Sequence, residues 1–173
     1  MKKKNSSFVN TKNLTKERGF TIVEIIIAIV VVVSVFGTIL SFFSLDIKNS
    51  ARNRTRLQAI LLAQEAMEAV RNFRDNTIWS ENGLGILIAG TNYHPVVASS
   101  GWSIVSGNEI TGIFTRNIVF YNTSRGVNDD IESVYNPANN DPDTKKVMVM
   151  VSWDDQYGPA SESLTSYITN WRN

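Results

Sequence analysis

The sequence predicts an α+β fold in which one long N-terminal helix packs on a small antiparallel β-sheet. Three observations lead to this fold class. Residues 25–45 form an uncharged apolar run, residues 59–73 carry an apolar stripe with helical spacing, and the chain after residue 77 alternates short β-branched runs with Gly, Asn and Ser turns. A helix with one apolar stripe and a sheet with one apolar face bury both surfaces by packing together.

The N-terminal segment is basic and leads into the apolar run. The first nineteen residues hold six Lys or Arg against Glu17. Residues 25–45 would extend about 31 Å as a helix, which matches one bilayer core. The run is too long for a secretory signal and no Ala-x-Ala site closes it, so we expect it to stay in the protein. The positive-inside tendency then places the N-terminus in the cytoplasm, and Arg52, Arg54 and Arg56 weaken this asymmetry without reversing it.

Glu24 interrupts the start of this apolar segment. An acidic group at a bilayer centre costs roughly 2.5–3.5 kcal/mol, and less near an edge. The carboxylate either reaches the headgroup zone or has a partner in the membrane. The best candidate for such a partner is a free α-ammonium made by cutting the chain after Gly19, where glycine lets a protease approach the backbone closely.

A short motif, Gly19-Phe20-Thr21 with Glu24, lies between a basic leader and about twenty apolar residues. This arrangement resembles that of type IV pilins and of the pseudopilins of type II secretion. The resemblance covers residues 14–70, and residues 64–71 with the closing strands look most like the minor-pilin branch, which includes V-type minor pilins and I-type minor pseudopilins. It implies that Gly19 ends the leader, that Phe20 becomes an N-methylated first residue, and that Phe20, Thr21 and Glu24 serve assembly, with Glu24 pairing with the Phe20 amine of a neighbouring subunit.

The resemblance also implies a domain plan and a set of partners. Residues 1–19 would be a leader that is removed, 20–45 the transmembrane and assembly half of the helix, 46–76 its amphipathic half, and 77–173 an extracytoplasmic β-rich head. The implied partners are other pilin or pseudopilin subunits, a prepilin peptidase that is also the N-methyltransferase, an inner-membrane assembly platform and the lipid bilayer. The implied location is the inner membrane, crossed once, and then the pilus or pseudopilus.

Two features depart from many pilins. No proline precedes Pro95, so with Gly37 as the only weak point we expect a continuous helix. The chain has no cysteine, so the head must be stable without disulfides, for which about a hundred residues suffice.

The second half of the predicted helix carries the apolar stripe. Its members are Ala59, Leu62, Ala63, Ala66, Met67, Val70 and Phe73. Recurrence every three and four residues places them on one helix face, which we expect to be core rather than a ligand site. The helix should end at Asn76 or at Asn82-Gly83, because both residue types accept a left-handed terminus.

The head should be built from strands. The runs richest in β-branched and aromatic residues are 85–88, 102–105, 114–121, 147–153 and 164–171, with 147–151 the clearest. Short connections favour antiparallel pairing.

Charge is uneven along the chain. Residues 46–75 sum to +2 and everything after residue 75 sums to −5. Acidic heads could face basic helix segments of neighbouring subunits, or Arg52, Arg54 and Arg56 could simply meet lipid headgroups or solvent. At two-residue spacing these three arginines cannot share one helix face. An acidic head also disfavours nucleic acid, since phosphate contacts dominate such binding.

Cofactors and catalysis find little support. The candidate calcium ligands are Asp129, Asp130, Asp141 and Asp143, which supply hard oxygen atoms but match no EF-hand spacing. Acidic turn residues are common, so calcium is left open and no other cofactor is expected.

His94 is the single histidine, in an expected exposed turn, and no Gly-x-Ser-x-Gly elbow occurs. We expect no enzyme.

The sequence therefore favours a structural subunit of a type IV pilus or type II secretion-like filament. Two alternatives stay open. The same stem could carry an adhesin or a DNA-uptake receptor, or the chain could be a single-pass anchored protein that forms no filament.

Overall fold

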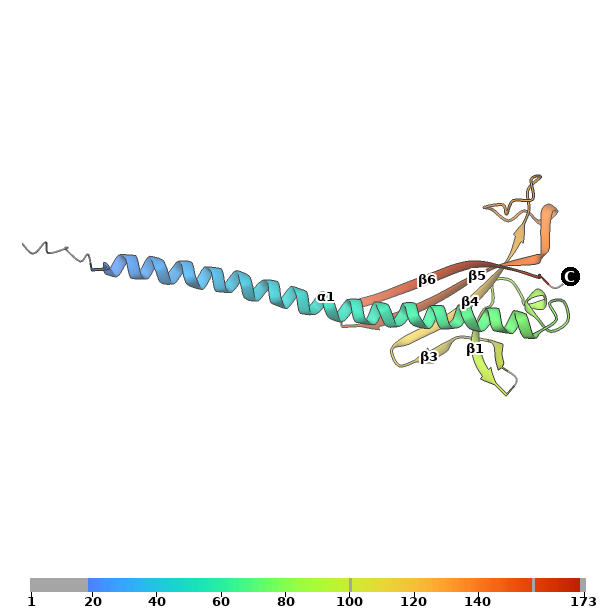
Figure 1. Cartoon of the computed structure of the whole chain (residues 1–173), viewed down its shortest axis with the longest axis horizontal. Coiled ribbons are helices and arrows are strands. Elements are labelled where there is room, and N and C mark those ends of the chain that lie inside the picture. Colours follow the sequence, from blue (N-terminus) through green and yellow to red (C-terminus); the bar gives the residue numbers. More distant parts are fainter. Residues whose placement is uncertain (1–18, 100, 157, 172–173) are drawn as a thin grey trace, which may run out of the picture. The chain divides into compact units, whose positions relative to one another are not determined.

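The computed structural model describes residues 19–99, 101–156 and 158–171. The predicted leader before Gly19 lies outside these residues. The chain divides into two compact units, Met1–Ile47 and Lys48–Asn173, which are described separately. One helix, α1 (Ile22–Asn76), contributes to both (Figure 1). The prediction of an α+β fold, with one long N-terminal helix packed on a small antiparallel sheet, is confirmed, and the sheet has six strands.

In the first unit, α1 begins directly after Thr21. The Thr21 carbonyl accepts hydrogen bonds from the amides of Glu24 and Ile25 at 3.1 and 3.2 Å, and its hydroxyl accepts a third from the Glu24 amide at 3.3 Å, which caps the helix. Further along, hydroxyl groups donate to carbonyls four residues back, so these hydroxyls need no water. These hydroxyls belong to Ser34, Thr38, Ser41 and Ser44.

The helix passes Gly37 without a break, as the absence of proline predicted. It is long and apolar enough to cross a membrane, which by itself is weak support for a membrane protein.

In the second unit, the helix residues from Lys48 onward pack on the sheet (Figure 1). The predicted apolar stripe is buried, with Leu62 half-buried at its margin and Ala69 added to it. The helix ends at Asn76, the first of the two predicted ends. There the Thr77 hydroxyl donates to the Phe73 carbonyl at 2.6 Å, satisfying one of the last carbonyls.

The sheet is antiparallel throughout, in the order β2-β1-β4-β5-β6, with β3 paired to β4. The strands are β1 (Asn92–Ala98), β2 (Gly101–Ser106), β3 (Glu109–Thr111), β4 (Phe114–Ser124), β5 (Asn140–Asp155) and β6 (Gly158–Thr169). Four of the five predicted strands are confirmed as β2, β4, β5 and β6. β5 and β6 begin earlier than predicted, and β6 ends at Thr169 rather than at residue 171.

The predicted strand at 85–88 is wrong. Leu84–Ile86 forms a short 3₁₀ helix, η1, that places Leu84 in the core. A Cβ on Gly85 would lie 2.6 Å from the Trp79 carbonyl oxygen, so this segment is a tight turn against Trp79. A second short 3₁₀ helix, η2 (Pro137–Asn139), precedes β5.

Strands β1 and β3 were not predicted. β1 contains Pro95, which normally counts against a strand. Because β1 pairs with β4 only at Asn92 and Tyr93, Pro95 lies where one side of the strand is free and the missing N–H is tolerated. His94, expected in an exposed turn, instead lies within β1 and is half-buried.

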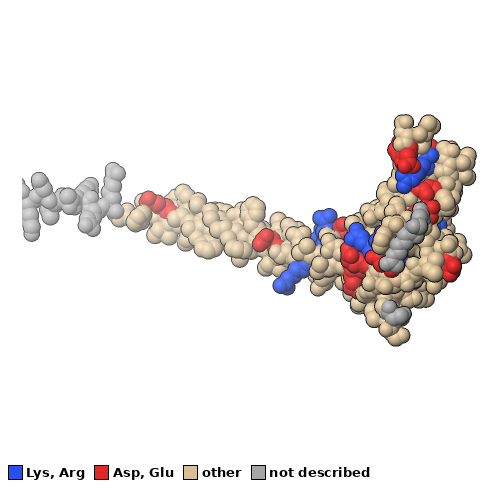
Figure 2. Space-filling view, turned by 45° about the vertical axis from the view of Figure 1, so that its right-hand side comes forward, with Lys and Arg blue, Asp and Glu red and all other residues tan. Residues whose placement is uncertain are grey.

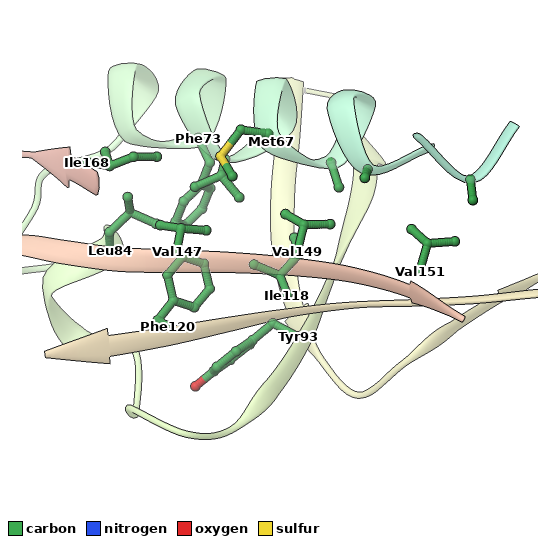
Figure 3. Packing of buried hydrophobic residues seen from close by; sticks show 14 of the residues in the cluster. Met67, Phe73, Leu84, Tyr93, Ile118, Phe120, Val147, Val149, Val151 and Ile168 are labelled. Carbon is green, nitrogen blue, oxygen red and sulfur yellow. The ribbon is translucent and has the colours of Figure 1, made fainter. Parts of the chain in front are cut away.

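The core lies between α1 and the sheet (Figure 3). Alternate residues of β5 face the helix, namely Val147, Val149 and Val151, all fully buried. Ile118 and Phe120 of β4 join them opposite Met67 and Phe73 of α1 (Figure 3). Period-two alternation therefore sends Lys146 and Met148 to the other face of the sheet.

Candidate functional site

The candidate site is the start of α1, where the sequence placed Phe20, Thr21 and Glu24. Thr21 and Glu24 have the spacing of a capping box, in which each side chain bonds the other residue's amide. The structure shows one half, the Thr21 hydroxyl accepting from the Glu24 amide at 3.3 Å. The Glu24 side chain is exposed and makes no hydrogen bond or ion pair with any other described residue. Capping therefore does not use its carboxylate.

The Glu24 carboxylate is set among apolar side chains. A surface hollow of about 530 Å³ is lined by Phe20, Glu24, Ile25, Ala28, Ile29, Val32 and Val33. Phe20 itself is 79% exposed. The hollow therefore combines one negative charge, in the helix's first turn where the macrodipole favours it, with an uncovered apolar wall.

The rest of the first unit's helix is equally uncovered. Every residue from 22 to 47 is exposed, and the large apolar ones are mostly half or more accessible. Figure 2 shows this stretch as surface with few charged side chains. Contiguous apolar surface of this extent marks a membrane or protein contact.

Gly19 is exposed and unobstructed. A Cβ placed on it would meet nothing within 4 Å. The peptide bond between Gly19 and Phe20 is therefore open to approach in this structure.

The structure separates Arg52, Arg54 and Arg56 of α1. Arg56 pairs with Glu162 of β6 at 2.6 Å. Arg52 and Arg56, one turn apart, line a hollow of about 220 Å³ beside Trp153 that does not include Arg54. The expectation that they cannot share one face is confirmed, and Arg56 uses a carboxylate of its own head.

The four calcium candidates are divided by the fold. Asp141 accepts from Arg125 Nε at 2.6 Å, and the Asp129 carbonyl accepts from Arg125 Nη1 at 2.7 Å. Asp143 instead accepts from Asn170 at 2.9 Å. Within the described ranges, no three potential ligand side chains gather as a metal would need. Arg125 already supplies positive charge between Asp129 and Asp141.

Ionisation in this cluster follows from its contacts. Burial alone would raise the pKa of Asp141, but hydrogen bonds from Thr144, Arg125 and the Asp143 amide outweigh it, so its pKa lies below the usual value. The Asp141 hydrogen bond raises the pKa of Arg125. The cluster is therefore an internal ion pair that anchors the loop after β4.

Sequence reasoning missed Arg116, a buried cation between helix and sheet. Its side chain is 6% exposed and donates to Glu109 at 2.5 and 2.8 Å and to the Leu62 carbonyl at 3.0 Å. Glu65 lies 3.6 Å away. Its position was readable from the strand alternation, because Arg116 shares the parity of Phe114, Ile118 and Phe120.

Comparison of the chain with protein-family models, with curated proteins and with solved structures finds no match.

Proposed function

We propose that this chain is a structural subunit, of the minor pilin or minor pseudopilin kind, in a type IV pilus or type II secretion-like filament. The observation that carries the proposal is the exposed Glu24 carboxylate at the start of an uncharged, uncovered helix. A plain membrane anchor gains nothing from a charge there. A helix that packs against other copies of itself can use the charge to pair with a neighbouring copy.

The motif supplies the missing positive charge. Cutting after Gly19 creates an α-ammonium on Phe20, four residues before Glu24. A second copy displaced along the helix axis brings its amine to this carboxylate, so that both charges are neutralised in an apolar setting. Removing either partner would leave an uncompensated charge, which makes the register between copies specific.

The two units suit a division of tasks. In the first unit, the apolar helix is covered by lipid before assembly and by neighbouring helices afterwards. In the second, the folded head stays outside the membrane, while the basic N-terminus is held in the cytoplasm. We propose no catalytic role, and the partners are other subunits of this kind, the prepilin peptidase and the assembly platform.

The test is the substitution Glu24→Ala in cells. We expect normal membrane insertion and normal processing, because the apolar helix and Gly19 are unchanged, but strongly reduced incorporation into sheared filaments, measured by immunoblot. Glu68→Ala is the matched control, since Glu68 is an exposed carboxylate on the same helix that pairs with Arg71 one turn away.

Wild-type incorporation of the Glu24→Ala protein would contradict the ion pair. If the unaltered protein is processed but never recovered in a filament fraction, the chain is instead a single-pass anchor.

A further inference from the structure

A third hollow lies on the face of the sheet that points away from α1. Three of its side chains form a row across neighbouring strands, because Tyr121 of β4 pairs with Lys146 of β5, which pairs with Tyr167 of β6. Met148 follows Lys146 on the same face. The loop before η2 closes one side. The complete lining, called the tyrosine pocket below, is Tyr121, Asn122, Thr123, Glu132, Ser133, Tyr135, Lys146, Met148 and Tyr167, around about 270 Å³.

The tyrosines present flat apolar surfaces to this hollow. Tyr121, Tyr135 and Tyr167 are 37%, 42% and 45% exposed, so part of each residue is accessible to a ligand. Directly opposed residues in antiparallel strands hold their Cβ atoms about 4.5–5.5 Å apart. Tyr121 and Tyr167 therefore flank Lys146 on the two neighbouring strands, and the pocket offers aromatic surface. The Tyr135 hydroxyl donates to Asn140 at 3.0 Å.

Two charged groups in the pocket have no ion-pair partner in the part of the chain that the structure describes. The Oε2 atom of Glu132 is buried and has no hydrogen-bond donor among the described residues, although the residue's backbone is fixed by a 2.9 Å bond from its amide to the Ser124 carbonyl. Lys146 makes no ion pair with any described residue, whereas the neighbouring Lys145 donates to Asn122 at 2.8 Å. A buried acceptor without a donor is costly unless a ligand supplies one.

These groups restrict the chemistry of the ligand. The Glu132 carboxylate would repel an anionic group, and the Lys146 ammonium would repel a cationic group. A purely apolar ligand would leave the Glu132 oxygen unpaired. A ligand that fits these groups carries no net charge, donates to Glu132, accepts from Lys146 and presents apolar faces to the tyrosines.

A sugar ring meets all of these requirements. Its hydroxyls donate and accept, and its C–H faces can lie on aromatic rings. The pocket volume is just below the range of about 300–1,000 Å³ found for drug-sized ligands, which suits one ring. We propose that the tyrosine pocket binds a neutral saccharide unit, with Glu132 accepting from and Lys146 donating to its hydroxyls, and with Tyr121 and Tyr167 contacting its faces. The proposal does not depend on filament assembly, because one copy supplies every residue.

The experiment uses the full chain in a zwitterionic detergent, since sugar-headed detergents would compete. The probes are the methyl glycosides of glucose, galactose, mannose and N-acetylglucosamine, with N-acetylneuraminic acid as the anionic comparison, and binding is measured by saturation-transfer NMR and titration. We expect at least one neutral glycoside to bind, more tightly than the anionic sugar.

Substitutions locate the binding. Tyr167→Ala and Glu132→Gln should each weaken it by about tenfold, the effect of losing a ring contact or a hydrogen bond to a charged group, while Tyr167→Phe should retain most of it. The controls are Ile110→Ala, an exposed residue of β3, and Glu81→Gln, an exposed carboxylate in a turn. Unchanged thermal unfolding shows that each variant is folded.

The proposal is overturned if no neutral glycoside binds, if only the anionic sugar binds, or if folded Tyr167→Ala and Glu132→Gln proteins bind as the unaltered chain does. None of these outcomes bears on filament incorporation, which depends on Glu24.

Discussion

At the scale of single residues, two arginines connect separate elements of the head. Exposed salt bridges add little to its stability. Arg116 links β3 and β4 to the Leu62 carbonyl of α1, and Arg125 links the loop after β4 to Asp141 of β5. Each guanidinium uses several donors, and the planar fork matches this geometry better than an ammonium does. Exposed pairs such as Arg71 with Glu68 add little.

The first prediction concerns Arg116→Met. The substitution keeps much of the side chain's volume but removes the hydrogen bonds that Arg116 donates to the Leu62 carbonyl and to Glu109, so we expect a loss of about 2–3 kcal/mol in the free energy of unfolding. Denaturant unfolding of the full chain in detergent measures it. Arg71→Met is the control, with an expected change within about 0.5 kcal/mol. Equal stability of the two variants would show that the buried contacts are not stabilising.

The second prediction concerns acid. The pKa of Asp141 is lower in the folded protein than the value of about 3.9 for an unfolded chain. The folded state thus binds this proton less tightly, so the stabilisation is present above pH about 4 and is lost as the pH falls through the folded pKa.

Thermal unfolding at neutral pH and below pH about 4 tests this effect. We expect Asp141→Asn to be less stable than the unaltered chain at neutral pH and to lose less on acidification. An identical acid response of both proteins would exclude Asp141 as a contributor. Asp154→Asn, an exposed carboxylate of the same strand, is the control.

At the scale of elements, the buried face of α1 is built from small residues. Ala59, Ala66 and Ala69 are completely buried and Ala63 nearly so. The core between α1 and the sheet combines these alanines with the larger side chains of Met67, Val70 and Phe73, and protein interiors are packed to the density of organic crystals. The packing of α1 on the sheet thus depends on the small size of the side chains on its buried face as well as on their helical spacing.

The third prediction follows from this packing. Ala66→Leu forces extra volume between α1 and the sheet, and we expect it to lower the free energy of unfolding by about 1–3 kcal/mol. Gln64→Leu, on the exposed side of the same helix turn, should change it by no more than about 0.5 kcal/mol. Chemical denaturation compares them, and a neutral Ala66→Leu would mean that the interface has room to spare.

At the scale of the whole molecule, the two units depend on different environments. The second unit buries its own core, while the first leaves an apolar helix uncovered. The head retains the acidic balance read from the sequence, but Figure 2 shows basic and acidic side chains mixed on its visible face. Arg56 with Glu162 illustrates how local pairs offset the difference in net charge between segments.

The fourth prediction tests the processing step of the proposed function. Gly19→Leu places a bulky side chain at the bond to be cut, so we expect an uncut precursor that remains in the membrane, detected by intact mass and N-terminal sequencing. Gly37→Leu makes the same change in an open part of the helix and should be processed normally. Mature-length protein from Gly19→Leu would place the cut elsewhere.

Much of the fold was predictable because its signals are local. An uncharged run, a stripe at helical spacing and alternating strands depend on residues a few positions apart. They predicted α1, with Asn76 as one of two candidate ends, and most of β2, β4, β5 and β6. The predicted strand at 85–88 was wrong because the turn that forms there depends on contact with Trp79. Strand β1 was not predicted because a proline such as Pro95 is tolerated only at a free strand edge.

The sequence by itself determined the apolar span, the exposed acid at position 24 and the fold class, since each follows from composition and period. The tertiary structure alone decided that Arg125 stands between Asp129 and Asp141, that Arg116 is buried against Leu62, and that Tyr121, Lys146 and Tyr167 form one row. These groupings join residues up to 54 positions apart in the case of Arg116, and only the pairing register of the sheet and the packing of α1 bring them together.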